Sequence, residues 1–282
     1  MKIKNLTYGN DSISSLKGAD RVRKRPAVIF GSDGIEGCEH SAFEILSNSI
    51  DEAREGFGKA ITLTLFEDHS IEVEDHGRGI PVDYNKNEGK FNWELVFCEL
   101  YAGGKYNNQE AQSYEYSLGL NGLGLCSTQY SSEYMDVEIK RDGYIYTLHF
   151  EKGENIGGLH KVPYSGNDTG TKIKWKPDIE VFTDINISSN YFLDIIKRQA
   201  IVNDGIDFIF KKQEGTEFTT TNFNYQNGIV DHVKEVVGDN GMIPVQFWKS
   251  EKMVKDREDK PKYKTKINAA VTFSNRVSLA EY

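Results

Sequence analysis

The composition of the chain favours a globular protein and excludes several classes. Its 282 residues, of which 38% are hydrophobic and 12% aromatic, suffice for one large domain or for a domain with part of a second. The formal net charge of −9 argues against a surface that binds nucleic acid throughout. If the protein acts on DNA, another domain or chain must make most of the contacts with the phosphates. No run approaches the ~20 apolar residues of a membrane helix. The N-terminus also lacks the apolar core of a signal peptide, so we expect a cytoplasmic protein with no membrane partner.

The first regular elements follow a polar arm over residues 1–20. A basic run over residues 21–25 comes next, and a solvated turn or a specific contact explains it about equally well. Apolar residues then recur at helical spacing over 39–57 and predict an amphipathic helix. Two strands are predicted at 60–66 and 71–75, where a glycine ends the second.

The remainder of the chain alternates between glycine-rich connections and regular elements. The segment 102–121 is long for a connection, as functional lids tend to be. Asp142-Gly143 between two strand-like runs is a hairpin signal. A change of composition over 215–224 indicates a boundary to a second element. The further elements we expect are a helical segment at 92–101, a helix from about 121–124, strands at 134–141, 144–151, 170–176 and 206–211, and a helix at 188–202.

Polar side chains share one face of the predicted helix over 39–57: Glu44, Asn48, Asp51, Glu52 and Glu55. A solvated acidic stripe opposite the core is one interpretation. The amide of Asn48, one turn after Glu44, favours a second, because together they can hold a water and a hydrated magnesium ion, which prefers oxygen ligands. A carboxylate beside a bound water can also act as a general base.

A second polar feature is the run Asp75-His76-Gly77-Arg78-Gly79-Ile80-Pro81 at a strand end. Asp75 can accept a hydrogen bond from an exocyclic amine such as N6 of adenine, and the glycines let backbone approach a flat base. An ordinary strand-to-loop turn explains the same residues. Thr171 opens a later strand and can bond this aspartate, a water or a base edge, or simply follow a turn.

Two glycine-rich runs precede a predicted helix: Ala102-Gly103-Gly104-Lys105 and Ser117-Leu118-Gly119-Leu120-Asn121-Gly122-Leu123-Gly124. Glycines before a helix expose backbone N–H groups, and the helix N-terminus adds partial positive charge, so this region can bind an anion, with Lys105 supplying a full charge. A glycine-rich loop without a ligand is the alternative. The pattern is neither a Walker loop nor a dinucleotide fingerprint, because its glycines run G-x-x-G-x-G.

Taken together, the motifs resemble the GHKL ATPases (gyrase, heat-shock chaperone, histidine kinase and mismatch-repair MutL proteins), and most closely the B subunits of DNA gyrase and topoisomerase IV. The likeness extends from about Tyr8 to Lys212. Residues 23–32 resemble the family's RKRPGMYIGS, residues 44–53 its E-x-x-D-N-[AS]-I-D-E-A helix, residues 75–82 its D-x-G-R-G-I-P-V, and residues 101–106 its AGGK[FY]. The resemblance implies an α+β fold over residues 18–213, a two-layer α/β sandwich of the GHKL (Bergerat) type with a mixed, mainly antiparallel sheet and helices on one face.

The resemblance also implies roles for the matching positions. Glu44 would be the general base, oriented by His40, and Asn48 would ligate magnesium. Asp75 would bind the adenine amine with help from a water and Thr171. The mouth of the pocket would be formed by Glu52, Arg78, Gly79, Ile80, Pro81 and, at the outer edge, Arg141. Tyr8 and Ile13 would reach a partner subunit's nucleotide from the N-terminal arm, and a lid of Lys105, Gly119, Leu120, Asn121, Gly122, Leu123 and Gly124 would wrap the triphosphate.

These roles imply the ATP-hydrolysing part of a bacterial type II DNA topoisomerase, in which ATP with Mg2+ closes a dimeric gate. The implied partners are a second copy through the arm at 1–17, a topoisomerase A subunit, DNA through other domains, and aminocoumarin-like inhibitors. Residues 222–282 resemble the start of the family's transducer domain without its Gln-Thr-Lys loop, which suggests a truncated domain. The lid departs from the family at Leu118, which replaces a glycine, and at Asn121, which replaces a histidine but keeps a donor for phosphate.

Three other functions use the same motifs. The first is a kinase or chaperone, and the second is a nucleotide-sensing module that neither hydrolyses ATP nor acts on DNA. The third is a phage-borne or toxin-like mimic of the B subunit. The presence of Glu44 argues against the sensing module, whereas the motifs leave gyrase and topoisomerase IV inseparable.

Overall fold

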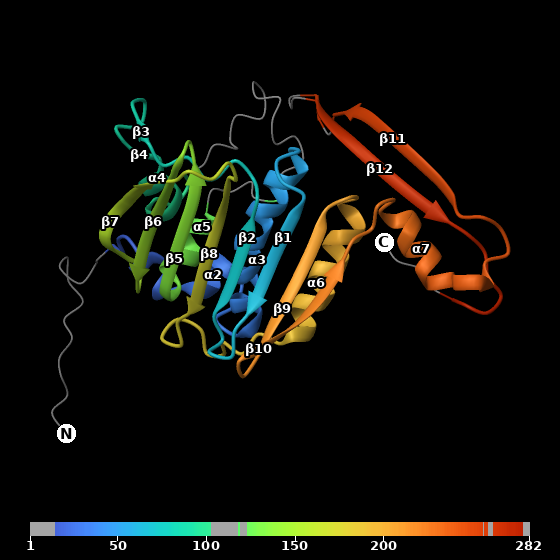
Figure 1. Cartoon of the computed structure of the whole chain (residues 1–282), viewed down its shortest axis with the longest axis horizontal. Helices are drawn as coiled ribbons and strands as arrows, with labels where there is room; N and C mark the ends of the chain where they lie inside the picture. The colour runs from blue at the N-terminus through green and yellow to red at the C-terminus, as the bar shows by residue number, and fades with distance from the viewer. Residues whose placement is uncertain (1–14, 103–117, 119–122, 256, 259–261, 279–282) are drawn as a thin grey trace.

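An eight-stranded mixed sheet forms the centre of the protein (Figure 1). The structure is a computed structural model and describes residues 15–102, 118, 123–255, 257–258 and 262–278. The strand order is β10-β9-β1-β2-β8-β5-β6-β7. β1 pairs in parallel with β9, and every other neighbouring pair is antiparallel, so the mixed, mainly antiparallel sheet expected from the sequence is confirmed. The strands are β1 Ala60–Leu65, β2 Ile71–Asp75, β5 Ser132–Arg141, β6 Tyr144–Glu151, β7 Glu154–Pro163, β8 Gly170–Pro177, β9 Asp207–Glu214 and β10 Glu217–Phe223.

Helices cover one face of this sheet and lie behind it in Figure 1. They are α1 Asp20–Arg23, α2 Pro26–Phe30, α3 Ile35–Arg54, α4 Asn92–Cys98, α5 Gly124–Tyr130 and α6 Ser189–Val202. Because side chains alternate along a strand, Ile71, Val73 and Asp75 of β2 are buried under the helices, while Glu72 and Glu74 point to the other face. The core therefore forms between α3 and the strands, and Asp75 lies at its edge.

The long helix begins and ends earlier than the predicted range of 39–57. α3 starts at Ile35, directly after Gly34, whose backbone is extended, and its first turn packs closely on the preceding segment: a methyl group at Gly37 would lie 2.1 Å from the carbonyl oxygen of Ser32. The helix ends at Arg54, since Gly56 takes a φ of +90° that breaks helical geometry. Phe57 therefore lies outside the helix instead of on its apolar face.

Several elements have no counterpart in the sequence prediction. The short hairpin of β3 Tyr84–Asn85 and β4 Lys90–Phe91 precedes α4, and β7 forms one edge of the sheet. After β10 come α7 Ile229–Val237 and a hairpin of β11 Gln246–Val254 and β12 Tyr263–Val271, which lie apart from the large sheet in Figure 1. The boundaries of the domains at 17, 213 and 222 stay predictions. In the part of the chain that the structure describes, no helix is both long and apolar enough to cross a bilayer.

Candidate functional site

A buried carboxylate, Asp75, lies at the end of β2 on the face that the helices cover. Its Oδ1 accepts hydrogen bonds from the backbone N–H of Gly77 at 3.0 Å and of Thr171 at 3.2 Å, and its Oδ2 accepts one from Ser49 Oγ at 2.8 Å. Burial raises the pKa of Asp75; the three hydrogen bonds oppose this effect and the Glu52 carboxylate adds to it. Because a carboxylate offers about four acceptor sites, Asp75 can accept one further bond from a ligand.

A clamp between α3 and the loop after β2 holds the wall of the site. Arg78 donates to Glu52 from Nε at 2.7 Å and from Nη2 at 2.9 Å, and its backbone N–H donates to the same carboxylate at 2.9 Å. The guanidinium carbon of Arg78 lies 3.8 Å from the centroid of the Phe57 ring. A methyl group at Gly77 would lie 2.3 Å from Glu52 Cγ, so this close approach requires glycine. Arg78 and Glu52, both expected at the mouth of a pocket, are thus in direct contact.

A second carboxylate, Glu44, lies two turns before Glu52 on α3 and pairs with His40. His40 Nε2 is 3.1 Å from Glu44 Oε1, and His40 Nδ1 is 3.3 Å from the carbonyl oxygen of Phe30. Both partners are acceptors, so a ring that bonds to both carries two N–H groups. In keeping with this, the hydrogen bond to Glu44 raises the pKa of His40 and outweighs partial burial, which lowers it. On its other side Glu44 abuts α5, where a methyl group at Gly124 would lie 1.9 Å from Oε2.

Two more polar residues of α3, Asn48 and Asp51, make hydrogen bonds to the backbone. Asn48 Nδ2 donates to the carbonyl oxygen of Glu44 at 2.7 Å. Asp51 is buried, and its Oδ1 accepts a hydrogen bond from the backbone N–H of Leu118 at 2.8 Å. Asp51 is therefore not part of a solvated stripe, whereas the role of this face as a site stays a prediction.

The loop after Arg78 is pinned to the neighbouring strands. The backbone N–H of Ile80 donates to Thr171 Oγ1 at 3.2 Å, so Thr171 joins this loop to Asp75. Arg141, at the end of β5, donates from Nη1 to the carbonyl oxygen of Gly79 at 2.7 Å. Pro81 is exposed beyond this loop. Arg141 and Gly79 thus meet beside this loop, and their role at the mouth of a pocket stays a prediction.

Some predicted site residues lie outside the described residues: Tyr8, Ile13, Lys105, Gly119, Leu120, Asn121 and Gly122. Leu123 and Gly124 are described and join this region to α5. Two residues of the site were not predicted from the sequence: Ser49, the side-chain partner of Asp75, and Phe57, the ring beside Arg78. Of these two residues, only Ser49 could have been suspected from the sequence, because it lies between Asn48 and Asp51 on α3. Nothing local predicts the position of Phe57.

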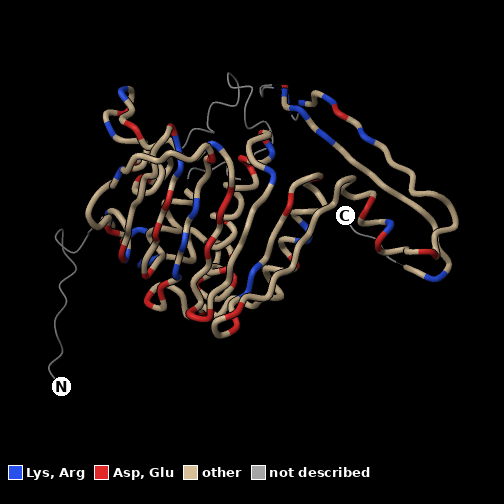
Figure 2. Tube along the Cα trace, in the orientation of Figure 1, with Lys and Arg blue, Asp and Glu red and all other residues tan. Residues whose placement is uncertain are grey.

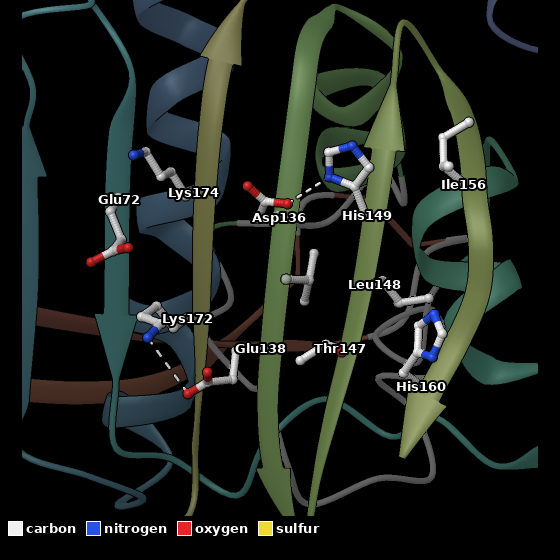
Figure 3. Close-up of a pocket in the computed structure, with 11 residues that line it drawn as sticks. Glu72, Asp136, Glu138, Thr147, Leu148, His149, Ile156, His160, Lys172 and Lys174 are labelled. Carbon is white, nitrogen blue, oxygen red and sulfur yellow. Dashed lines mark hydrogen bonds and ion pairs between the residues drawn. The ribbon is translucent and has the colours of Figure 1, made fainter. Parts of the chain in front are cut away.

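A hollow of about 400 Å³ lies on the opposite, uncovered face of the sheet (Figure 3). Its charged lining is paired across strands: Lys172 lies 3.5 Å from Glu138, and His149 lies 2.6 Å from Asp136. Basic and acidic residues are interspersed along these strands (Figure 2). Since this hollow is separated from Asp75 by the sheet itself, we place the candidate site on the covered face.

Two solved structures have a fold similar to that of this chain. The 43K ATPase domain of Thermus thermophilus gyrase B, in complex with an aminocoumarin, aligns with a TM-score of 0.68 and 28% identity over 86% of this chain and 60% of that chain. The topoisomerase IV ATP-binding domain of Francisella tularensis, in complex with a small-molecule inhibitor, aligns with a TM-score of 0.66 and 28% identity over 86% of this chain and 62% of that chain. The GHKL fold expected from the sequence is therefore confirmed.

Sequence comparisons agree with the structural ones. The B subunit of DNA gyrase from Thermotoga maritima is 37% identical over 227 residues, which are 80% of this chain and 35% of that protein. The B subunit of DNA topoisomerase 4 from Escherichia coli is 34% identical over 239 residues, which are 84% of this chain and 37% of that protein. The chain thus spans little more than a third of the length of these relatives. The family described as "Histidine kinase-, DNA gyrase B-, and HSP90-like ATPase" matches residues 35–180, more than half of the chain, and the protein belongs to that family.

Proposed function

We propose that this chain binds and hydrolyses ATP as the ATP-operated part of the B subunit of a bacterial type II DNA topoisomerase, either gyrase or topoisomerase IV. The observation that carries the proposal is that one helix, α3, bears Glu44 and also Ser49, the side chain that bonds to Asp75. Asp75 is buried with capacity for one more hydrogen bond, and Glu44 is paired with His40 on the helix above it. The names of the relatives support the wider role, which depends on the whole protein.

Asp75 recognises the adenine base in this proposal. Its one remaining acceptor position suits the exocyclic N6 amine, which is a donor. Thr171 and Gly77 donate backbone hydrogen bonds to it, and the glycines at 77 and 79 allow a flat ring to approach. Glu52, Arg78, Ile80 and Arg141 form the rim that orients the nucleotide.

Glu44 acts as the general base for hydrolysis. A carboxylate removes a proton from the attacking water as the water bonds to phosphorus, and the nucleoside diphosphate leaves with the electrons of the broken P–O bond. His40 holds the carboxylate through Oε1, while Gly124 leaves room for Oε2 beside the N-terminus of α5. His40 therefore orients Glu44 without contacting the phosphate itself.

Asn48 fits the role of the protein ligand of magnesium. Its Nδ2 is used in the bond to the Glu44 carbonyl, which leaves Oδ1 as the amide atom for a cation. A single neutral oxygen suits a hydrated Mg2+ held mainly by phosphates and water. Within the described ranges no group of three or more His, Cys, Asp or Glu side chains is placed to hold a metal. When bound, the ion would neutralise charge on the phosphates.

The remaining partners follow from the same assignment. They are a second copy of the chain through the N-terminal arm with Tyr8 and Ile13, a topoisomerase A subunit, and DNA bound by other domains, in the cytoplasm where such an enzyme meets the chromosome. The nucleotide would be wrapped by Lys105 and residues 119–124. An aminocoumarin in complex with a similar structure supports binding of such inhibitors. In this proposal they bind near Arg141, and their competition with ATP in calorimetry tests this.

Two substitutions separate binding from chemistry. Glu44→Ala should leave the affinity for ATP within a few-fold and lower single-turnover hydrolysis by roughly 10²–10⁴-fold, the contribution of a general base. Asp75→Asn should instead abolish binding, because Oδ1 stays with the two backbone N–H groups and the new amide presents a donor toward the adenine amine. Isothermal titration calorimetry with ATP and a quenched single-turnover assay measure the two effects.

Glu74→Gln is the matched control, since Glu74 precedes Asp75 but points to the uncovered face of the sheet. It should change neither affinity nor rate. Equal loss of affinity in the Glu44 and Asp75 variants would contradict the assignment of roles. Tight ATP binding by the wild type with no hydrolysis would instead favour the nucleotide-sensing function.

A further inference from the structure

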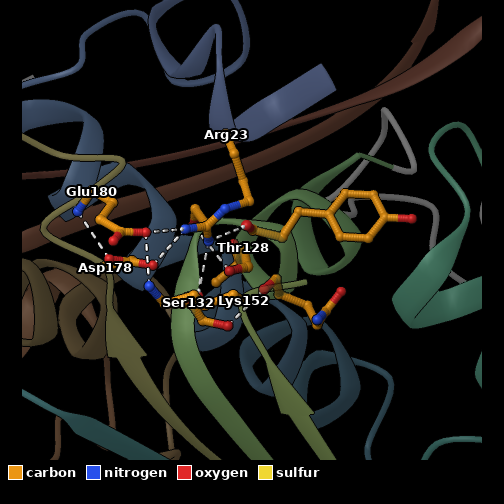
Figure 4. Close-up of polar contacts among 9 residues, drawn as sticks. Arg23, Thr128, Ser132, Lys152, Asp178 and Glu180 are labelled. Atoms are coloured by element: carbon orange, nitrogen blue, oxygen red, sulfur yellow. Dashed lines mark hydrogen bonds and ion pairs between the residues drawn. The ribbon is translucent and has the colours of Figure 1, made fainter. Parts of the chain in front are cut away.

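Arg23 is the one basic residue of the run over 21–25 whose side chain is largely buried, with 13% of it exposed, and it joins three parts of the fold (Figure 4). Its Nη2 lies 2.5 Å from Asp178 Oδ2, a carboxylate just after β8 with 3% of its side chain exposed. Its Nη1 donates to the carbonyl oxygens of Tyr130 at 3.2 Å and Ser132 at 3.1 Å. Of the two interpretations of the basic run, a specific contact is therefore correct for Arg23.

The first element that Arg23 holds is α5. Tyr130 is the last residue of α5, and its carbonyl is one of those that a helix leaves without an internal partner. A guanidinium at this end also suits the negative pole of the helix. The other end of α5 begins at Gly124, which is in close contact with Glu44 Oε2. A shift of α5 along its axis therefore changes the space for this oxygen.

The second element is the segment from α1 to α2. Arg23 ends α1, and α2 ends at the buried Phe30, seven residues later. The Phe30 carbonyl bonds to His40 Nδ1 at 3.3 Å, and His40 Nε2 bonds to Glu44 Oε1 at 3.1 Å. Arg23 is thus connected to one oxygen of Glu44 through α5 and to the other through Phe30 and His40.

We propose that Arg23 is a positioning residue for Glu44: by tying α1 to the C-terminal end of α5 and to Asp178, it fixes both elements that orient the Glu44 carboxylate. The proposal rests on the proposed role of Glu44 as general base. Arg23 contacts neither Glu44 nor His40, so it acts through their supports. Arginine is required because one guanidinium reaches a carboxylate and two carbonyls at once, which a lysine ammonium cannot match in geometry.

The test uses two variants, because a lone buried Asp178 can prevent folding. Arg23→Lys keeps the charge, and the double variant Arg23→Met with Asp178→Asn removes both charges. Lys24→Met, which breaks only the exposed pair of Lys24 with Asp20, is the control on the same segment. Ile196→Ala, a core change in α6, controls for lost stability. Each protein is measured for ATP affinity, single-turnover hydrolysis, and the pKa of His40 by NMR without nucleotide.

Both Arg23 variants should hydrolyse ATP roughly 10- to 100-fold more slowly, the effect of a small misplacement of a catalytic group, with affinity changed less than about threefold. The pKa of His40 should fall toward its ordinary value of 6.5 in these two proteins and stay raised in both controls. An unchanged His40 pKa, or an equal loss of rate in Ile196→Ala, overturns the proposal. Absence of hydrolysis in the wild type would refute the proposed function, while the His40 pKa would still decide the role of Arg23.

Discussion

At the scale of single residues, the site depends on polar groups that are buried and almost fully bonded. Asp75 accepts three hydrogen bonds yet keeps a raised pKa, so for this group burial outweighs hydrogen bonding. Such a carboxylate costs stability that a neutral side chain of the same shape does not. Binding sites commonly contain such destabilising groups, and the free acceptor position of Asp75 contributes nothing to the stability of the fold.

This cost makes a pH-dependent prediction for Asp75→Asn. The pKa of Asp75 is raised in the folded state, so the folded protein favours the protonated carboxyl group. The contribution of Asp75 to the free energy of unfolding is therefore fully present below its ordinary pKa of 3.8 and is lost as pH rises through the raised value. An asparagine stays neutral and keeps an oxygen for Gly77 and Thr171. The variant should therefore be more stable than the wild type at pH 7, and the difference should shrink toward zero near pH 4.

Urea unfolding at a series of pH values measures this difference. Glu74→Gln serves as the control on the same strand, because Glu74 lies on the open face of the sheet. A variant that is less stable than the wild type at pH 7, or a difference that does not vary with pH, would mean that burial is not what governs Asp75.

At the scale of elements, local patterns predicted those segments whose periodicity is strong. The core of α3, the alternation of β1 and β2, and the Asp142-Gly143 hairpin were all read from the sequence. β7 was missed because it is a largely exposed edge strand interrupted by Gly157 and Gly158, with a change of register opposite it between Thr147 and His149. Because no residue of β7 is buried, its sequence carries no alternation of apolar and polar residues that could predict a strand.

Long-range partners were also beyond local reasoning. Glu44, Asn48 and Asp75 were found through their spacing and the family resemblance, whereas the partners of Arg23 were not. Arg23 and Asp178 are 155 positions apart, and nothing in either local sequence reports the other. The same applies to Ser49 and Asp75, which belong to different elements.

The junction of β2 and β8 gives the prediction at this scale. Gly170 begins β8 with a φ of +155°, and a methyl group there would lie 2.1 Å from the carbonyl oxygen of Asp75. Gly170→Ala should therefore destabilise the protein by roughly 2–4 kcal/mol through backbone strain and overpacking, and should weaken ATP binding because Thr171 is displaced. Urea unfolding and calorimetry measure the two effects.

Gly143→Ala separates strain from crowding. Gly143 also has a positive φ, +77°, but has nothing within 4 Å of its added methyl group. It should cost only about 1–2 kcal/mol, the penalty for a left-handed residue, and should leave ATP affinity unchanged. If Gly170→Ala cost no more than Gly143→Ala, the close contact with Asp75 would not be a constraint.

At the scale of the whole molecule, the eight-stranded sheet and the β11–β12 hairpin differ in how far buried side chains stabilise them. The eight-stranded sheet has a core shared with α3 and α6, whereas both strands of the β11–β12 hairpin are exposed over most of their length. α7 packs on β12 and on α6. A polar contact supports that link: Glu235 of α7 accepts hydrogen bonds from Lys197 of α6 at 2.9 Å and from Tyr225 at 2.5 Å.

We therefore expect the hairpin to open independently of the sheet. A two-stranded hairpin is marginal by itself in water, and local opening requires less free energy than global unfolding. Amides of β11 and β12 should exchange with deuterium at least roughly 100-fold faster than those of β1 and β2, a difference of a few kcal/mol in opening. Hydrogen exchange followed by mass spectrometry measures this, and equal protection of both parts would contradict it.

Lastly, the parallel pairing of β1 with β9 affects how the chain folds during its synthesis. β1 is made early, but its parallel neighbour follows roughly 150 residues later. At roughly 5–20 residues per second, the ribosome takes on the order of ten seconds to deliver it. During that interval β1 has β2 as a local partner while its other edge stays open, which is the geometry that invites wrong pairing between chains. The nascent chain is thus most vulnerable while it is still being synthesised, before any nucleotide has a complete pocket to enter.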